Sequence, residues 1–153
     1  TRNMGLLDKM KGALNAVTGG AAKVQFMYGP QVLFPGEQVE VGINAASTGQ
    51  QVQSKGLFID LSATEVIDFK DQSDNHVRYQ EQTFYREIQV APAFVLVPGE
   101  TKQFRAVFVV PPEVRPSFDG KLCRHHWQIR GRVEAFGNDP DTGWVATRVG
   151  MKQ

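Results

Sequence analysis

The chain has 153 residues, 41% of them hydrophobic, and its 17 basic and 16 acidic side chains give a formal net charge of +1. This length fits one domain with a sizeable core, and the balanced charge excludes the strongly basic surface typical of nucleic-acid binding. No run of about 18 apolar residues predicts a membrane-spanning helix, and the single cysteine, Cys123, excludes an internal disulfide and favours the reducing cytoplasm.

Residues 4–18 have the pattern of a short amphipathic helix. Apolar side chains recur there every three or four residues, and polar side chains take the opposite side. Gly19 and Gly20 then supply the left-handed conformation that commonly ends a helix. The apolar stripe contains Leu6, Leu7, Met10, Leu14 and Val17, and the polar side contains Lys9 and Lys11.

Two interpretations of this helix stay open. It either packs against one end of the domain, or it is a detachable element that binds a partner groove or a membrane surface. The segment 1–23 carries four basic side chains and one acidic side chain, four minus one, or a net charge of +3. We expect residues 1–20 to form an appendage and residues 21–153 to form the folded domain.

The rest of the chain alternates between extended segments and turns. The period of two that marks a half-buried strand is clearest at 39–43, 57–61, 103–110 and 122–133. Pro35-Gly36 and Pro98-Gly99 predict tight turns. Further strands are expected at 24–28, 76–90, 94–97 and 144–149, the last pairing back on 134–136, with loops at 46–54, 71–75 and 137–143.

Strands that recur about every 8–12 residues without intervening helices exclude a parallel sheet with helical crossovers. They predict an all-β fold, an antiparallel immunoglobulin-like β-sandwich preceded by the short amphipathic helix. The functional surfaces of such a domain are normally its end loops, its sheet edges or an exposed sheet face.

The strand at 122–133 combines a core face with a basic face. Trp127 and Ile129 are expected to face the core together with Gly131 and Val133, because alternate residues of a strand share a face. The opposite face carries a basic stripe that is a candidate site for an anion or a protein partner, although acids on neighbouring strands can neutralise it. The stripe consists of Arg124, Arg130 and Arg132, together with Lys121.

Candidate chemical motifs are weak. His125 and His126 are adjacent in a strand, so they point to opposite faces and cannot hold one metal ion together. The segment 138–143 offers oxygens as a calcium loop does, but it lacks the closing glutamate. Ser117 has no nucleophile-elbow context. We therefore predict no catalytic, cofactor or metal site, and we do not expect an enzyme.

The segment 98–134 resembles the arrestin superfamily. It contains a proline-glycine turn at 98–99, an aromatic alternating strand at 104–108, a proline-rich bend at 111–120 and a strand from Trp127 to Val133. The earlier turn at 34–39 also looks like the family's first proline-glycine turn. An amphipathic helix, two glycines and then a sandwich are similar to the bacterial sporulation-control branch.

The resemblance implies an arrestin-like β-sandwich used as a scaffold or adaptor without catalysis. Typical arrestins have two such sandwiches in tandem, whereas this chain has room for one, and the sequence does not place their buried charged cluster. Receptor binding and individual functional residues are therefore not carried over.

The predicted function is a cytoplasmic, non-catalytic scaffold or adaptor that binds a protein partner through the helix and a sheet edge. Peripheral membrane contact through residues 4–18 and a homodimer through sheet edges are further expectations. The alternative is a sandwich that recognises a carbohydrate or a metal ion through the loops 71–75 and 138–143. The candidate partner-binding residues are Leu6, Leu7, Lys9, Met10, Lys11, Leu14, Arg124, Arg130 and Arg132.

Overall fold

The computed structural model of the chain describes residues 14–17, 22–29, 32–135 and 140–151. Within these ranges the chain forms eleven strands joined by turns and loops, and it forms no helix. The prediction of an all-β fold is confirmed. None of the described segments is therefore a helix long and apolar enough to cross a bilayer.

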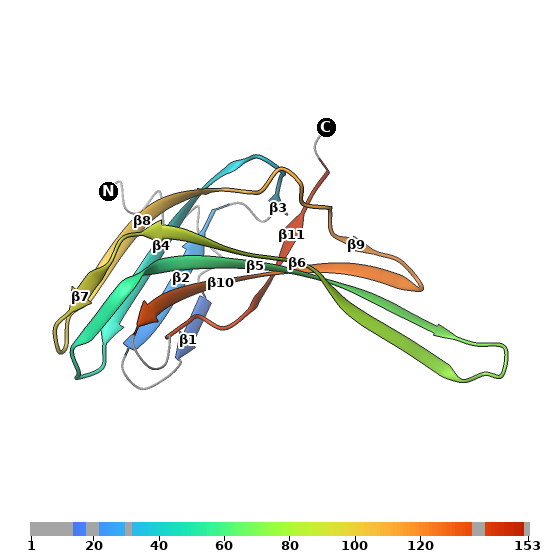
Figure 1. The fold of residues 1–153 in the computed structure, drawn as a ribbon, viewed down its shortest axis with the longest axis horizontal. Helices are drawn as coiled ribbons and strands as arrows, with labels where there is room; N and C mark the ends of the chain where they lie inside the picture. Colours follow the sequence, from blue (N-terminus) through green and yellow to red (C-terminus); the bar gives the residue numbers. More distant parts are fainter. Residues whose placement is uncertain (1–13, 18–21, 30–31, 136–139, 152–153) are drawn as a thin grey trace.

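The strands form two open sheets (Figure 1). The small sheet has the order β1 (Leu14–Val17), β2 (Ala22–Tyr28), β4 (Gln38–Ser47) and β8 (Thr101–Val109). The large sheet has the order β3 (Val32–Leu33), β11 (Val145–Val149), β10 (Cys123–Ala135), β5 (Val52–Lys70) and β6 (His76–Ala91). Two short strands add to it, since β7 (Phe94–Leu96) pairs with β5 and β9 (Phe118–Asp119) pairs with β10.

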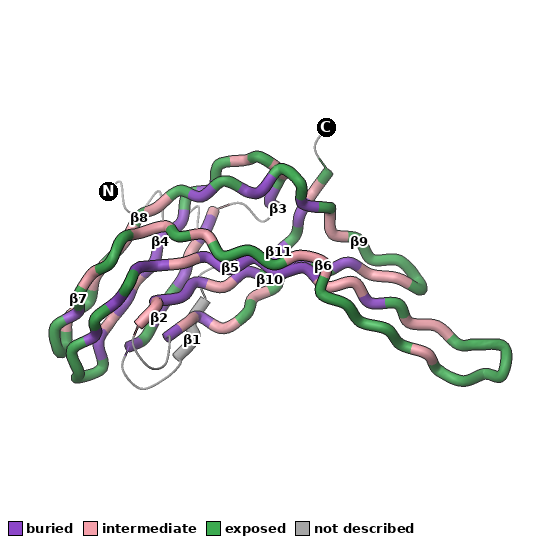
Figure 2. The backbone as a smooth tube through the Cα atoms, in the orientation of Figure 1, coloured by how far each residue is buried: buried purple, intermediate pink, exposed green. Residues whose placement is uncertain are grey.

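The core lies between the two sheets and is built from the alternate residues of each strand. Figure 2 shows the buried positions along the strands that face one another. The sheets approach one another closely where Gly131 of β10 meets Phe26 of β2, because a Cβ at this glycine would lie 3.4 Å from the phenylalanine side chain. Burying one large apolar side chain stabilises the fold by about 1.5–3 kcal/mol. The largest buried side chains include Phe26, Ile43, Phe108, Leu57, Ile59, Leu61, Trp127 and Ile129.

Both predicted proline-glycine turns are confirmed. Gly36 and Gly99 adopt φ angles of 78° and 77°, in the left-handed region that side chains with a Cβ disfavour. The turns close with equivalent hydrogen bonds, from Glu37 N–H to Phe34 O at 3.0 Å and from Glu100 N–H to Val97 O at 3.0 Å. These turns deliver the chain into β4 and β8, which pair with each other along their whole length.

The helix predicted over residues 4–18 is not supported. Residues 14–17 instead form β1, which pairs antiparallel with β2, Leu14 lying opposite Phe26 and Val17 opposite Lys23. Residues 4–13 lie outside the described part of the chain. The physical reason is the open edge of β2, whose main-chain groups bind those of β1. A short helix interrupted by a glycine is marginal in water and offers little competition.

The strand predicted at 144–149 is confirmed as β11, but its predicted register was wrong. It pairs with Trp127–Ile129 and not with 134–136. The preceding residues already occupy the nearer part of β10, since Val133 N–H donates to Pro140 O at 2.9 Å and Thr142 N–H donates to Gly131 O at 2.9 Å. β11 also pairs in parallel with β3, so the sandwich is not purely antiparallel.

The large sheet is longer than the small sheet. β5 has 19 residues whereas β4 has 10, and the hairpin of β5 and β6 therefore projects past the body of the molecule (Figure 1). We call residues 64–82 the arm. It contains the turn predicted at 71–75, and most of its residues are exposed or half-buried (Figure 2).

Candidate functional site

A cluster of charged side chains lies on the outer face of the large sheet, where β5 and β10 are neighbours. Asp60 is fully buried. Its Oδ2 accepts hydrogen bonds from Arg130 Nε at 2.9 Å and from Arg132 Nε at 3.0 Å, and its Oδ1 accepts one from Arg132 Nη2 at 3.2 Å. A buried carboxylate needs such partners because desolvation of an unpaired charge costs several kcal/mol, on the order of 5.

Aromatic rings shield this cluster from solvent. The Arg130 guanidinium lies 4.4 Å from the centre of the Trp144 ring, and the Arg132 guanidinium lies 4.9 Å from that of Phe58. Both contacts fit cation–π geometry. Tyr85 packs edge-on against Trp144, and its pKa is raised by burial first and then by the negative charge of Asp60.

One feature of the sequence could have predicted this buried cluster. Asp60 is an acid between Ile59 and Leu61, within the segment 56–63, whose other residues are apolar or small. A charge in such a strand is rarely buried unless it is paired, and the arginines two residues apart on β10 are its partners.

The predicted basic stripe is brought to one face, but it is not an open basic surface. Arg132 is buried, and Arg130 is mostly enclosed. Arg124 is half-buried, with Nη2 at 3.6 Å from Asp68 Oδ2. Partner binding by these three arginines stays a prediction, with Arg124 the most accessible of them.

The other predicted partner-binding residues lie at the N-terminus. Leu14 belongs to β1, where it lies opposite Phe26. The remaining five fall outside the described residues: Leu6, Leu7, Lys9, Met10 and Lys11.

The two adjacent histidines point to opposite faces, as predicted. His125 is buried, with Nδ1 at 2.9 Å from Pro116 O and Nε2 at 2.7 Å from Thr83 Oγ1. His126 is exposed, and its Nε2 lies 2.9 Å from Asp119 Oδ1. This hydrogen bond holds the pKa of the Asp119 carboxyl below its usual value, and nearby arginines contribute to the same shift.

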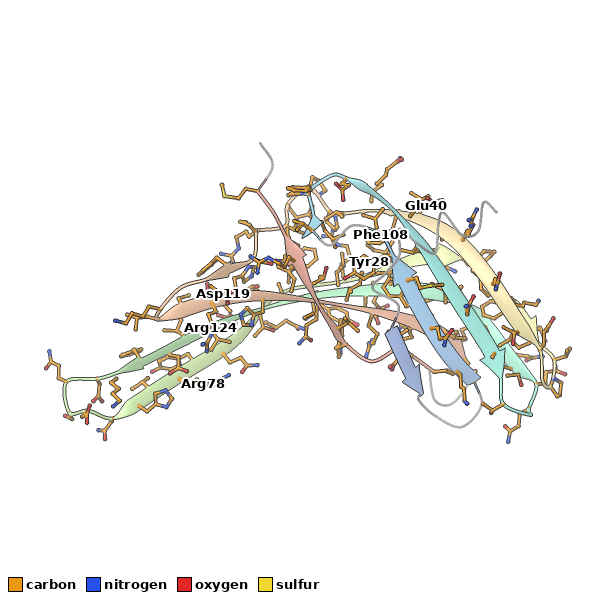
Figure 3. The ribbon with its side chains drawn as sticks, turned by 180° about the vertical axis from the view of Figure 1, so that it is seen from behind. Tyr28, Glu40, Arg78, Phe108, Asp119 and Arg124 are labelled. Carbon is orange, nitrogen blue, oxygen red and sulfur yellow. The ribbon has the colours of Figure 1, made fainter. Side chains whose placement is uncertain are left out.

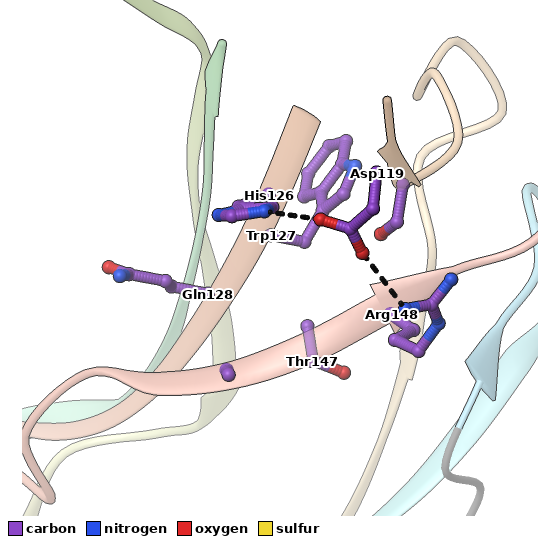
Figure 4. A pocket seen from close by; sticks show the side chains of 8 residues that line it. Asp119, His126, Trp127, Gln128, Thr147 and Arg148 are labelled. Carbon is purple, nitrogen blue, oxygen red and sulfur yellow. Dashed lines mark hydrogen bonds and ion pairs between the residues drawn. The ribbon is translucent and has the colours of Figure 1, made fainter. Parts of the chain in front are cut away.

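His126 and Asp119 line a pocket of about 260 Å³ (Figure 4). The pocket opens where β9 and β11, which both border β10, diverge from one another. Arg148 closes one side, with Nη1 at 3.7 Å from Asp119 Oδ2. Ser117 Oγ also lines the pocket, but it accepts the Val149 N–H at 2.9 Å. This arrangement is not the serine–histidine hydrogen bond that activates a nucleophile.

In each predicted end loop, one carboxylate oxygen of a described residue already accepts main-chain hydrogen bonds. Asp71 Oδ1 accepts the N–H groups of Ser73 and Asn75, each at 2.9 Å. In the other loop, Asp141 Oδ1 accepts the Gly143 N–H at 2.6 Å. Within the described ranges no three histidine, cysteine or acidic side chains are grouped as a metal ion would need.

The outer edge of β8 is an accessible surface that the sequence did not single out. In the described sheets β8 has one hydrogen-bonded neighbour, β4. Val110 N–H donates to Glu37 O at 2.9 Å, so Val110 faces β4. Because main-chain groups alternate sides along an antiparallel strand, those of Val107 and Val109 point away from β4. The side chains of these two valines are 54% and 49% exposed.

The two sheets and their order define the class of fold as an arrestin-like β-sandwich. A comparison with solved structures shows this similarity with the crystal structure of Spo0M, a sporulation control protein from Bacillus subtilis. The TM-score is 0.58 and the sequence identity 22%, over 88% of this chain and 51% of that one. The chain thus spans about half the length of Spo0M. No protein-family model matches the chain, and the comparison with characterised proteins found no match.

Proposed function

We propose that the chain is a non-catalytic adaptor or scaffold domain, acting in the cytoplasm, that binds a protein partner by strand addition to the edge of β8. The observation that carries the proposal is the exposed pair Val107 and Val109 on a strand that, among the described residues, has a hydrogen-bonded neighbour on one side only. An extended segment of a partner gains affinity from main-chain hydrogen bonds at such an edge, and specificity from the alternate side chains beside it.

The chemistry of this edge favours an apolar segment. An added strand would place its side chains beside Val107 and Val109, which need an apolar cover.

The non-catalytic character is supported by the arrangement of the polar groups. In the pocket beside β9, the Asp119 carboxylate is paired with His126, but the Ser117 hydroxyl is bound to the main chain of β11. The buried charges of Asp60 and Arg132 are paired with each other and therefore hold the sheet together. Spo0M is a control protein, and a regulatory role for this chain is compatible with an adaptor.

A second contact through residues 4–13, to the partner or to a membrane surface, remains part of the proposal. Its test must spare β1, because Leu14–Val17 pair with β2. Deletion of residues 1–13 is expected to leave the sandwich folded and to reduce binding to the partner or to liposomes.

The edge of β8 is tested by Val107→Pro, with Val107→Ala as the matched control. Proline removes the outward N–H of residue 107 and leaves the ladder with β4 intact. We expect proteins that the parent chain captures from lysate of its own organism to be retained by V107A and lost with V107P. Purified partner should then bind V107P at least about tenfold more weakly in calorimetry, as loss of main-chain hydrogen bonds predicts.

Two results would contradict the proposal. Equal binding of the identified partner to V107P and to the parent chain would exclude strand addition at this edge. A turnover assay that responds to a single substitution at Asp119 or His126 would contradict the non-catalytic function.

A further inference from the structure

β6 forms an edge of the large sheet, and its hydrogen-bonded neighbour among the described strands is β5. It is 16 residues long and contains no proline. Such an edge presents a row of unpaired main-chain groups to which another strand can bind. Figure 3 shows Arg78 of this strand out on the arm, beyond Arg124 and far from Glu40 of the small sheet.

The direction of the main-chain groups on the arm follows from one hydrogen bond. Asp68 N–H donates to Leu122 O at 2.8 Å, on the side of β5 that faces away from β6. Arg78 lies directly opposite Asp68. In an antiparallel pair, opposite residues either both face the partner strand or both face away. The N–H and C=O of Arg78 therefore point to the open edge, and so do those of Gln80.

Two bulges divide β6 into segments. Thr83 is an extra residue between the pairs Thr64–Gln82 and Ala63–Phe84, and Val90 is a second extra residue near the end of the strand. Each bulge shifts by one residue the alternation of main-chain groups that point towards β5 or away from it. Up to residue 82, even-numbered residues such as Arg78 have outward main-chain groups, whereas from 84 to 89 odd-numbered residues such as Glu87 have them.

The arm also carries an uncovered apolar face. Ile67 lies opposite Tyr79, and Phe69 lies opposite Val77, on the face that continues the buried stripe of Leu61 and its neighbours. Ile67 is 36% exposed and Tyr79 is 65% exposed. Beyond Ile67, which pairs with Cys123 at the start of β10, the arm has only β5 and β6 among the described strands. A two-stranded ribbon is marginal in water by itself, so a strand added beside Val77 and Arg78 would stabilise the arm.

We propose that the occupant of this edge is a second copy of the chain, paired antiparallel through β6 about a two-fold axis near Thr83. Residues 76–82 of each copy then lie along residues 83–89 of the other, between the start of the strand and its second bulge. In this register Arg78 faces Glu87, Tyr79 faces Arg86 and Val77 faces Ile88. These are an ion pair, a cation–π pair and an apolar pair, each formed twice.

The pleat and the charges select this register together. Each of the three pairs joins an odd-numbered with an even-numbered residue, one on each side of the bulge at Thr83. Because the bulge shifts the alternation by one residue, the two side chains of each pair lie on the same face of the combined sheet. A slip of the register by one residue would place Arg78 opposite Arg86. It would also pair residues whose side chains lie on different faces of the sheet. Arg78 and Glu87 both keep about half of their side chains exposed beside their present partners, Asp68 and Arg132. Pairing through β6 is independent of partner binding at β8, which lies in the other sheet.

The experiment uses the full chain and compares Gln80→Pro with Gln80→Ala in sedimentation equilibrium. Proline removes an outward N–H and spares the bonds to β5, whereas alanine keeps the N–H. We expect the parent chain and Q80A to dimerise and Q80P to associate at least about tenfold more weakly. Arg78→Glu should weaken the dimer because it opposes Glu87, whereas Lys23→Glu on the small sheet should not.

Amide exchange of the parent chain provides a measurement that does not depend on the fold of a variant. The N–H groups of Arg78 and Gln80 should exchange more slowly as the protein concentration rises. Those of Val77 and Tyr79, bonded to β5, should be protected at every concentration. A parent chain that stays monomeric, a Q80P dimer as tight as that of Q80A, or exchange at Arg78 and Gln80 that is independent of concentration would overturn the proposal.

Discussion

At the scale of single residues, Asp60 illustrates how a buried charge is retained in a β-sandwich. It lies opposite Arg130 and diagonal to Arg132, so one carboxylate accepts hydrogen bonds from two guanidinium groups. Removal of one partner from such a group leaves an uncompensated charge, and that loss costs more than the intact pair contributes.

We therefore predict that Asp60→Ala lowers the free energy of unfolding by about 3–5 kcal/mol. The variant removes the buried carboxylate from two arginines, which keep the longer contacts of Arg130 with Asp141 at 3.9 Å and of Arg132 with Glu87 at 3.5 Å. Urea unfolding followed by circular dichroism measures the change. The matched control is Asp68→Ala, whose contact with Arg124 is at 3.6 Å and partly exposed, and which should cost no more than about 1 kcal/mol. Equal losses for both variants would show that the buried cluster is not a structural requirement.

The two neighbouring histidines show how position in a strand separates identical side chains. His125 is enclosed by Pro116 and Thr83, and His126 faces solvent and Asp119. The period of two determines this difference, and the sequence was therefore sufficient to predict that the two imidazoles point to opposite faces of the strand.

At the scale of elements, the two proline-glycine turns set the register of β4 against β8. Each turn closes with a hydrogen bond of 3.0 Å, and the following strands align from Gln38 with Val109 to Ala46 with Thr101. The two turns have the same Pro-Gly-Glu sequence and the same conformation, and each leads the chain into one strand of the antiparallel pair.

We predict that Gly36→Ala destabilises the protein by about 1–2 kcal/mol, the cost of the left-handed conformation for a residue with a Cβ. No atom lies within 4 Å of the position where the Cβ would be, so the strain comes from the backbone and not from a clash. Gly36→Asn is the control, and it should lose less because asparagine tolerates this conformation. Thermal melts of both variants measure the difference, and an alanine variant as stable as the parent chain would contradict the expected strain.

At the scale of the whole molecule, the unequal lengths of the sheets divide the chain into a body and an arm. The body buries the alternate residues of both sheets, whereas the arm repeats the same pattern without a covering layer. The stability of the fold should therefore reside in the body, and the arm should serve contacts with other molecules.

Shortening the arm tests this division. Replacement of residues 68–78 by Asn-Gly joins Ile67 to Tyr79, which are already opposite one another, through a two-residue turn of a type that hairpins favour. We expect the shortened chain to remain folded, with a loss of stability below about 2 kcal/mol, and to be monomeric in sedimentation. Unfolding of the shortened chain, checked by circular dichroism, would show that the arm is part of the core.

The sequence by itself determined the strand content, the inward faces of β4, β5, β8 and β10, and the two turns. These features depend on the period of two and on the backbone preferences of proline and glycine, which are local properties. The arrestin-like fold could also be predicted, because the residues that carry the resemblance occur in order along one segment, 98–134.

Only the tertiary structure decided which strands meet. The open edge of β2 makes a strand of Leu14–Val17, although their spacing predicted a helix. The residues Pro140–Thr142 pair with Gly131–Val133, and β11 therefore pairs further along β10 than predicted. Because β5 and β10 are neighbours, Arg130 and Arg132 of the predicted basic stripe are enclosed around Asp60. These outcomes depend on main-chain groups and charges distant in sequence, and a local pattern carries no information about such partners.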